Sequence, residues 1–329
     1  IRYLPFARKI LSHLLKKRVN KIDSVEKYQD IFENIVEGVV KNSITNFTVS
    51  GIKNINPDKG YLFIANHRDI TLDSALLNLT LHQNNLSTTY NAVGNNLLGE
   101  KWASDLMRLN KSFIIDRSDK SKRDIYRSLN LASEFIFNAI NNNNHSIWIA
   151  QRQGRSKDGN DYTDPSVIKM IHLNARKKIS LSEYLNKLNV VPVSISYEKD
   201  PNDILKAKEL YLTNLNKIYI KERKEDMQSI AEGINGQKGN VNLTIGNVMT
   251  FNSDSYEECS YEITENIRKL FYLHPTNYAA AIMQGRDIDY PEEWSYEIKE
   301  STEYLKRRLS LIPDEMHPYL LNQYSNSIP

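Results

Sequence analysis

Between residues 45 and 246, short apolar runs alternate with stretches of helical periodicity, and this alternation limits the folds open to the chain. The runs are rich in Val, Ile, Phe and Tyr, as strands are. Strands that alternate with helices predict an α/β fold with a mixed, largely parallel sheet and helices on both faces. The predicted strands are Phe47–Ile52, Tyr61–Ala65, Thr89–Val93, Ser112–Ile115, Ser146–Ala150, Val190–Tyr197 and Val241–Ile245. The predicted helices are Leu72–Leu81, Lys122–Asn141, Pro165–Asn174, Leu181–Leu188 and about Lys221–Gly233.

Helical segments are predicted on both sides of this region. The first 18 residues carry six basic side chains and no acid, with apolar residues at helical spacing. Such a helix can lie on an anionic membrane or pack on the core, and both readings stay open. A second helix is predicted from Ser24 to about Lys41. After Phe251 the pattern is helical to about Leu309 and then loop-like near two prolines. We therefore predict an N-terminal helical segment (1–44), an α/β domain (45–250) and a helical C-terminal extension (251–329).

Composition excludes several classes of protein. The chain has 43 Lys and Arg against 40 Asp and Glu. Its basic residues are interspersed with acids and no nucleic-acid-reading motif is evident, so no nucleic-acid partner is expected. The single cysteine, Cys259, forbids an intrachain disulfide and a cysteine-based metal cluster. No apolar run reaches the roughly 18 residues that a membrane-spanning helix needs.

The sharpest motif follows the predicted strand 61–65, where His67, Asp69 and Asp73 come just after Asn66 and before a helix. The carboxyl end of a strand is where α/β sheets place ligands. A histidine there can act as a general base if a carboxylate fixes its tautomer. Asp73 reaches the ring only if the intervening turn bends, whereas Asp69 can cap the helix. The competing interpretation is a capping aspartate beside an ordinary loop histidine.

Two further strands end in basic loops. Arg117 follows the strand 112–115, and residues 151–159 follow the strand 146–150 with three cations and two glycines. Arginine binds phosphate through paired hydrogen bonds, and glycine lets loop N–H groups approach an anion. The loops therefore predict a phosphate-binding site, although their residues do not have the order and spacing of a Walker loop. The alternative for the loop at Arg117 is a solvated turn, because acids partly cancel its cations.

Together with the Val-Pro-Val strand at 190–197, these segments resemble the ordered blocks of the glycerol-3-phosphate/1-acylglycerol-3-phosphate acyltransferase superfamily, the PlsC-like and PlsB-like phospholipid acyltransferases. That family has Asn-His with a following Asp, an apolar segment ending in Arg, a Gly-Arg-Ser type loop and a Val-Pro-Val strand. All four occur here in that order, over about 130 residues from Asn66 to Tyr197. Each block is weakly specific alone, and the ordered set is more specific.

The resemblance implies an O-acyltransferase that moves a fatty acyl group from acyl-CoA or acyl-carrier protein to glycerol-3-phosphate or a lysophospholipid. It puts the general base on His67 and its partner on Asp73, with Asp69 as runner-up. It implies no serine or cysteine nucleophile, no metal and no cofactor besides the acyl donor. Lipid substrates further imply a peripheral enzyme on the cytoplasmic side of a membrane. The implied substrate and phosphate contacts are Arg117, Arg152, Gln153, Gly154, Arg155, Ser156 and Lys157.

The chain departs from the family pattern at two points. Five residues separate His67 from Asp73 where the common pattern has four, and Gln153 stands where the family usually has glutamate. The longer spacing is similar to that in branches of the superfamily that acylate amino-acid lipids. Two alternatives therefore stay open, an acyltransferase for a lyso-amino-acid lipid and a weakly catalytic module that binds acyl-CoA or lipid.

Overall fold

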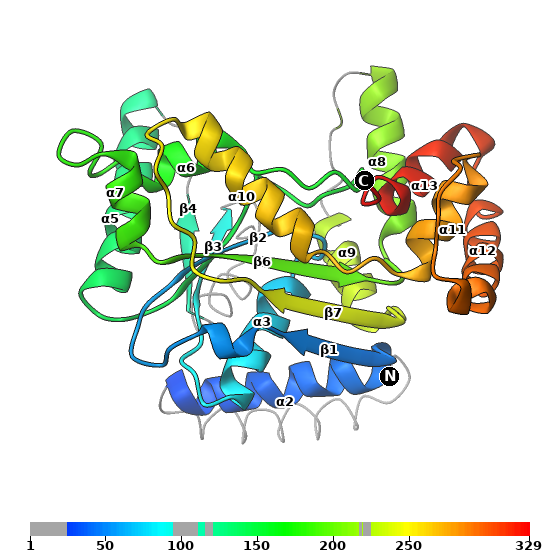
Figure 1. Ribbon diagram of the computed structural model, residues 1–329, viewed down its shortest axis with the longest axis horizontal. Helices are drawn as coiled ribbons and strands as arrows, with labels where there is room; N and C mark the ends of the chain where they lie inside the picture. Colours follow the sequence, from blue (N-terminus) through cyan, green and yellow to red (C-terminus); the bar gives the residue numbers. More distant parts are fainter. Residues whose placement is uncertain (1–24, 95–110, 116–120, 217–218, 220–224) are drawn as a thin grey trace, which may run out of the picture.

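A seven-stranded sheet forms the centre of the computed structural model, which describes residues 25–94, 111–115, 121–216, 219 and 225–329 (Figure 1). Its strand order is β1-β7-β6-β2-β5-β3-β4. Every neighbouring pair is parallel except β6 and β7, which are antiparallel. The predicted mixed, largely parallel sheet is therefore confirmed. The strands are β1 (Asn46–Ser50), β2 (Leu62–Ala65), β3 (Tyr90–Gly94), β4 (Ser112–Ile115), β5 (Ile147–Ala150), β6 (Val190–Tyr197) and β7 (Asn240–Ile245).

Helices cover both faces of the sheet because the side chains of its central strands alternate between two apolar cores. In β2, Leu62 and Ile64 join the core under α5, α6, α7 and α10, whereas Phe63 and Ala65 join the core under α2 and α3. Figure 1 shows these two helical layers on opposite sides of the strands. The bounds are α2 (Val25–Ser43), α3 (Leu72–Gln83), α5 (Lys122–Asn141), α6 (Pro165–Ile171), α7 (Leu181–Lys187) and α10 (Tyr256–Leu270).

A third apolar cluster lies beyond the end of β6, at the right of Figure 1, and is built from α8, α11, α12 and α13. Helix α9 contacts α2. The predicted division of the chain at residue 250 stays a prediction, with α10 packed on the sheet and α8 packed on the later helices. The bounds are α8 (Asp203–Asn216), α9 (Glu225–Asn235), α11 (Pro275–Met283), α12 (Ser295–Leu309) and α13 (His317–Ser325).

Two details differ from the expectations. Helix α8 was not predicted. The loop expected near Pro318 is instead α13, because proline in the first turn of a helix loses no hydrogen bond. Strand β6 is internal in the sheet and has a proline, Pro192, near its start; the missing N–H of Pro192 falls just before the first β6–β7 pair, Val193 with Ile245.

The predicted amphipathic helix over the first 18 residues lies outside the described residues. Within the described ranges, no helix is long and apolar enough to cross a bilayer.

Candidate active site

The turn between β2 and α3 brings His67 against Asp73. Asn66, which is fully buried, fixes the start of this turn by exchanging hydrogen bonds with the backbone of Ile195 on β6. The chain then bends so that the His67 Nδ1 atom lies 2.8 Å from Asp73 Oδ2. The bend that the His–Asp spacing required is therefore present. Asp73 sits in the first turn of α3, so the helix fixes its position relative to the strand.

Asp73 and Asp69 take different places in this turn. Asp73 Oδ2 also accepts hydrogen bonds from the backbone N–H groups of Arg68 (2.6 Å) and Asp69 (3.0 Å). The Asp69 side chain accepts from the N–H groups of Thr71 and Leu72, both at 2.9 Å, and so caps α3. Burial, and then the charge of Asp73, raise the pKa of the Asp69 carboxyl. The geometry therefore pairs the ring with Asp73 and leaves Asp69 as the helix cap.

The other side of the imidazole is open. Its Nε2 atom has no hydrogen-bond partner among the residues that the structure describes, and the His67 side chain is 15% exposed. The Trp148 ring packs against the imidazole in a T-shaped arrangement, with 5.6 Å between ring centroids. If Nδ1 carries the proton donated to Asp73, then Nε2 is the free base. This nitrogen is therefore placed to take a proton from a bound hydroxyl group.

The loop after β5 touches the same turn, because the Ser156 N–H donates to the His67 carbonyl oxygen over 2.7 Å. Ser156 itself is buried, and its hydroxyl donates to the Asn160 carbonyl oxygen. Gln153 and Gly154 are exposed, and Gly154 has a φ of +75°, which favours glycine. The loop and the histidine turn therefore form one continuous structure.

The cations of this loop differ in how they are paired. Arg152 lies 3.3 Å from Asp158 and stacks over Tyr162, and Lys157 pairs with Glu209 of α8. Arg155 donates to the Ser229 hydroxyl of α9 at 2.7 Å and forms no ion pair with a carboxylate in the described part of the chain. Arg155 is thus the loop cation whose charge is least compensated.

Arg117 lies outside the described residues, so its place relative to this loop stays a prediction.

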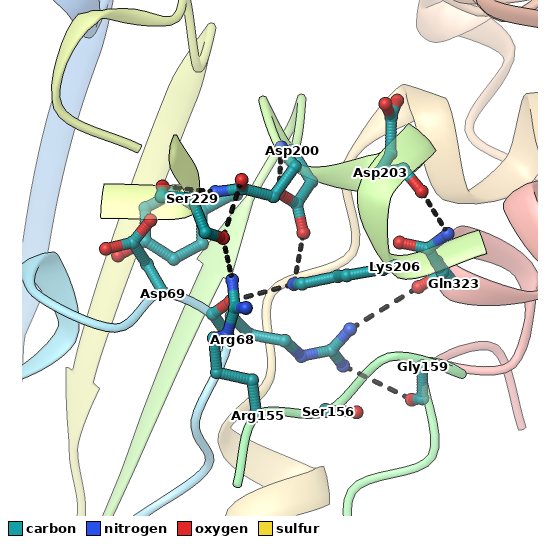
Figure 2. A network of polar contacts seen from close by, with 12 residues as sticks. Arg68, Asp69, Arg155, Ser156, Gly159, Asp200, Asp203, Lys206, Ser229 and Gln323 are labelled. Atoms are coloured by element: carbon teal, nitrogen blue, oxygen red, sulfur yellow. Dashed lines mark hydrogen bonds and ion pairs between the residues drawn. The ribbon is translucent and has the colours of Figure 1, made fainter. Parts of the chain in front are cut away.

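Two basic residues that the sequence patterns did not bring out hold the turn between β2 and α3 (Figure 2). The Arg68 guanidinium donates to Asp161 Oδ2 (2.7 Å) and to the carbonyl oxygens of Gly159 (3.2 Å) and Gln323 (3.4 Å). Lys206 Nζ of α8 donates to the Arg68 carbonyl oxygen at 2.7 Å and pairs with Asp200. Burial lowers the pKa of Lys206, and the Lys206 ammonium holds the pKa of Asp200 below its usual value although burial opposes this. No local pattern marks either residue.

A metal site is not evident in the described ranges, where no three His, Cys, Asp or Glu side chains group together in a way that can hold an ion. The expectation that the reaction needs no metal stays a prediction.

Comparisons with known proteins bear on the segment that contains this site. The family model described as Acyltransferase matches residues 46–196, which span the His67 turn, the loop after β5 and most of β6. Among solved structures, the chain is similar to that of the 1-acyl-sn-glycerophosphate (LPA) acyltransferase PlsC from Thermotoga maritima. The identity is 15% and the TM-score 0.47, and the match covers 79% of this chain and 86% of that one. A comparison with curated proteins finds no match.

Proposed function

We propose that this protein moves a fatty acyl group from a thioester donor to the hydroxyl of glycerol-3-phosphate or a lysophospholipid, because residues 46–196 match the family model described as Acyltransferase. The donor is acyl-CoA or acyl-carrier protein. The observation that carries the proposal is the His67–Asp73 pair, 2.8 Å apart, with Nε2 of the ring free to accept a proton. The acyl donor is the only co-substrate, with no metal and no further cofactor.

The chemistry needs one base that later becomes an acid. Nε2 of His67 takes the proton of the acceptor hydroxyl as its oxygen attacks the thioester carbonyl carbon. The tetrahedral intermediate then collapses, the C–S bond breaks, and the imidazolium returns its proton to the thiolate. Asp73 holds the Nδ1–H tautomer and stabilises the positive ring between these steps, as the aspartate of a serine-protease triad does. Nucleophilic catalysis by serine or cysteine is not part of this route.

The phosphate of the acceptor is held by the loop after β5. Arg155 supports this proposal because its charge is the least compensated of the loop cations and because it belongs to the loop whose Ser156 N–H contacts His67. Gln153 and Gly154 are exposed on the same loop and belong to the same proposed set. Arg152 and Lys157 are engaged with acids, so they shape the loop and contribute to its field. Arg117 belongs to the same proposed set.

The substrates place the enzyme at a membrane surface. Long acyl chains and lysolipids reside in bilayers, so the proposal includes peripheral association on the cytoplasmic side. The six cations and no acids among the first 18 residues support it, because anionic lipids attract basic amphipathic segments.

The test is acyl transfer by the purified protein in mixed micelles, with a radiolabelled acyl donor and each acceptor in turn. His67→Ala should lower the rate by about 10²–10⁴-fold, the usual contribution of a general base, with circular dichroism unchanged. Asp73→Asn should also lose activity. Asp69→Asn is the matched control, because its amide oxygen can still cap α3, and it should stay close to wild type. Near-wild-type turnover by folded His67→Ala would contradict the mechanism.

A second acceptor class, a lyso-amino-acid lipid, is favoured by the five residues between His67 and Asp73 and by Gln153, which lacks the charge of glutamate. The same assay separates the two classes when glycerol-3-phosphate, lysophosphatidate and a lyso-amino-acid lipid are compared side by side. Binding of acyl-CoA without turnover on any of the three would instead indicate a binding module.

A further inference from the structure

Tyr197, the last residue of β6, contacts the carboxylate that orients the histidine. Its hydroxyl donates to Asp73 Oδ1 over 2.8 Å, across 124 residues of sequence. The other carboxylate oxygen, Oδ2, faces His67 Nδ1 and the backbone N–H groups of Arg68 and Asp69. The tyrosine therefore binds the one oxygen of Asp73 that the turn itself leaves unoccupied.

This contact controls how the carboxylate is turned. Rotation about the Cβ–Cγ bond moves both oxygens together, so the three donors on Oδ2 already oppose it, and the donor to Oδ1 opposes it at the second oxygen as well. Among the residues that the structure describes, Tyr197 is the hydrogen-bond donor to Oδ1. A hydrogen bond from a neutral donor also draws negative charge toward Oδ1 and away from the histidine.

We propose that Tyr197 is a positioning residue for acyl transfer: its phenol fixes the Asp73 carboxylate and thereby sets the orientation and basicity of His67. The proposal rests on the function proposed above, because it assigns Tyr197 a role in that reaction. Tyr197 does not touch the substrate in this scheme. It acts through Asp73 alone.

Negative charges around the Tyr197 phenol keep its hydroxyl protonated, so the hydroxyl remains a hydrogen-bond donor. Asp69 on the turn and Asp200 after β6 also face it, and Arg68 lines the same cavity. Lys206 of α8 compensates Asp200. Loss of hydration, and then the charges of Asp73 and Asp69, raise the pKa of Tyr197 well above its usual value.

The hydroxyl of Tyr197 therefore stays protonated across the working pH range. Asp69 does not compete for its proton, because Oδ1 of Asp69 already caps α3 and the other oxygen faces Gly233.

The first test replaces Tyr197 with Phe and measures the rate against pH. Without the phenol, the Asp73 charge acts more fully on His67 and favours the imidazolium. The acid limb of the rate profile should therefore move to higher pH by about half a unit. The value of kcat should fall by about 3- to 30-fold with KM nearly unchanged, because a mispositioned base affects the chemical step.

Tyr184→Phe is the matched control. Tyr184 is fully buried on α7, on the opposite face of the sheet, and its hydroxyl donates to Asn174 at 3.0 Å and also interacts with Ser133. The Tyr184→Phe substitution removes the hydroxyl of a buried tyrosine, as Tyr197→Phe does, without touching the histidine turn. Tyr184→Phe should leave both the pH profile and kcat at wild-type values.

A second test does not depend on turnover. NMR titration of the His67 ring, assigned with His67→Ala, should show its midpoint at higher pH in Tyr197→Phe than in wild type. The difference should vanish when both proteins also carry Asp73→Asn. Site-specific 3-fluorotyrosine at position 197, a stronger donor of the same shape, should shift the midpoint the opposite way and keeps the test valid if the phenylalanine variant unfolds.

The outcomes separate the two proposals. If the wild type transfers no acyl group to any acceptor, the proposed function fails while the NMR titration still decides whether Tyr197 acts on His67. If the wild type is active and neither the acid limb nor the ring titration moves on changing Tyr197, the role of Tyr197 is refuted. A shift that persists with Asp73→Asn also overturns it, because the effect would not pass through the carboxylate.

Discussion

Replacing Gly159 with alanine should loosen the contact between the loop after β5 and the C-terminal helix α13. Gly159 has a φ of +80°, and a Cβ atom there would lie 2.6 Å from the Asn322 carbonyl oxygen and 2.7 Å from that of Gln323. Neither backbone oxygen can move without shifting the end of α13. Arg68 donates to the carbonyl oxygens of both Gly159 and Gln323, so the same displacement strains its contacts. One added methyl group therefore acts on the residue next to His67.

The expected loss of stability has two parts. Alanine in the left-handed region costs about 1–2 kcal/mol. Overpacking a rigid contact costs about 1–3 kcal/mol more, because the two backbone segments must separate by several tenths of an ångström. Gly159→Ala should thus lower the free energy of unfolding by about 2–5 kcal/mol.

Gly154→Ala supplies the matched control, since Gly154 has a φ of +75° but nothing lies within 4 Å of its added Cβ. Gly154→Ala should lose only the free energy of placing alanine in the left-handed region, about 1–2 kcal/mol. The difference between the two variants isolates the steric term. Urea unfolding followed by circular dichroism gives both values, provided that the slopes agree with wild type. Equal losses for the two variants would refute the close packing of α13 on this loop.

Two further predictions concern the charges of the site. Arg155→Ala should raise KM for a phosphate-bearing acceptor by about 10- to 100-fold with kcat less affected, as expected for the loss of one charge-assisted hydrogen bond. Steady-state kinetics with glycerol-3-phosphate measures this change. An unchanged KM would remove Arg155 from the phosphate site. Burial and Asp73 raise the pKa of Asp69 above its usual 3.8, so the folded state holds that proton more tightly and loses stability as pH rises from this value through the raised pKa. Asp69→Asn should remove that loss, which unfolding free energies measured from about pH 4 to about pH 7 would detect. A pH dependence identical to wild type would count against a raised pKa of Asp69.

The sheet was predictable because each strand is a compact apolar run bounded by turns. Ser112–Ile115 and Val190–Tyr197 have the bounds that were predicted, and helix Lys122–Asn141 does too. Helix α8 was missed for a physical reason. Lys206 is 2% exposed and lies where an apolar residue would complete the helical stripe, so a charge breaks the apolar periodicity of α8. Asp200 compensates this charge, and the ammonium also donates to the Arg68 carbonyl oxygen.

The motif of the candidate site could be predicted from the sequence, but the contacts that hold the motif in place could not. The order of blocks brought out His67 and Asp73, but the choice between Asp73 and Asp69 depended on a bend that spacing does not encode. The loop cations look equivalent in sequence, and partners distant along the chain distinguish them. Glu209 of α8 forms an ion pair with Lys157, whereas Arg155 donates a hydrogen bond to the Ser229 hydroxyl.

Three segments outside the His–Asp motif hold its turn in place. The Ser156 N–H binds the His67 carbonyl, Lys206 binds the Arg68 carbonyl, and Tyr197 binds Asp73. A general base works only when it lies within about half an ångström of its productive position, so these contacts matter as much as the motif itself. Because Arg68 also reaches Gln323 of α13, the C-terminal helices bear on the geometry of the turn as well as covering the fold. A chain with the four blocks but without these supports would carry the motif and lack the alignment that acyl transfer requires.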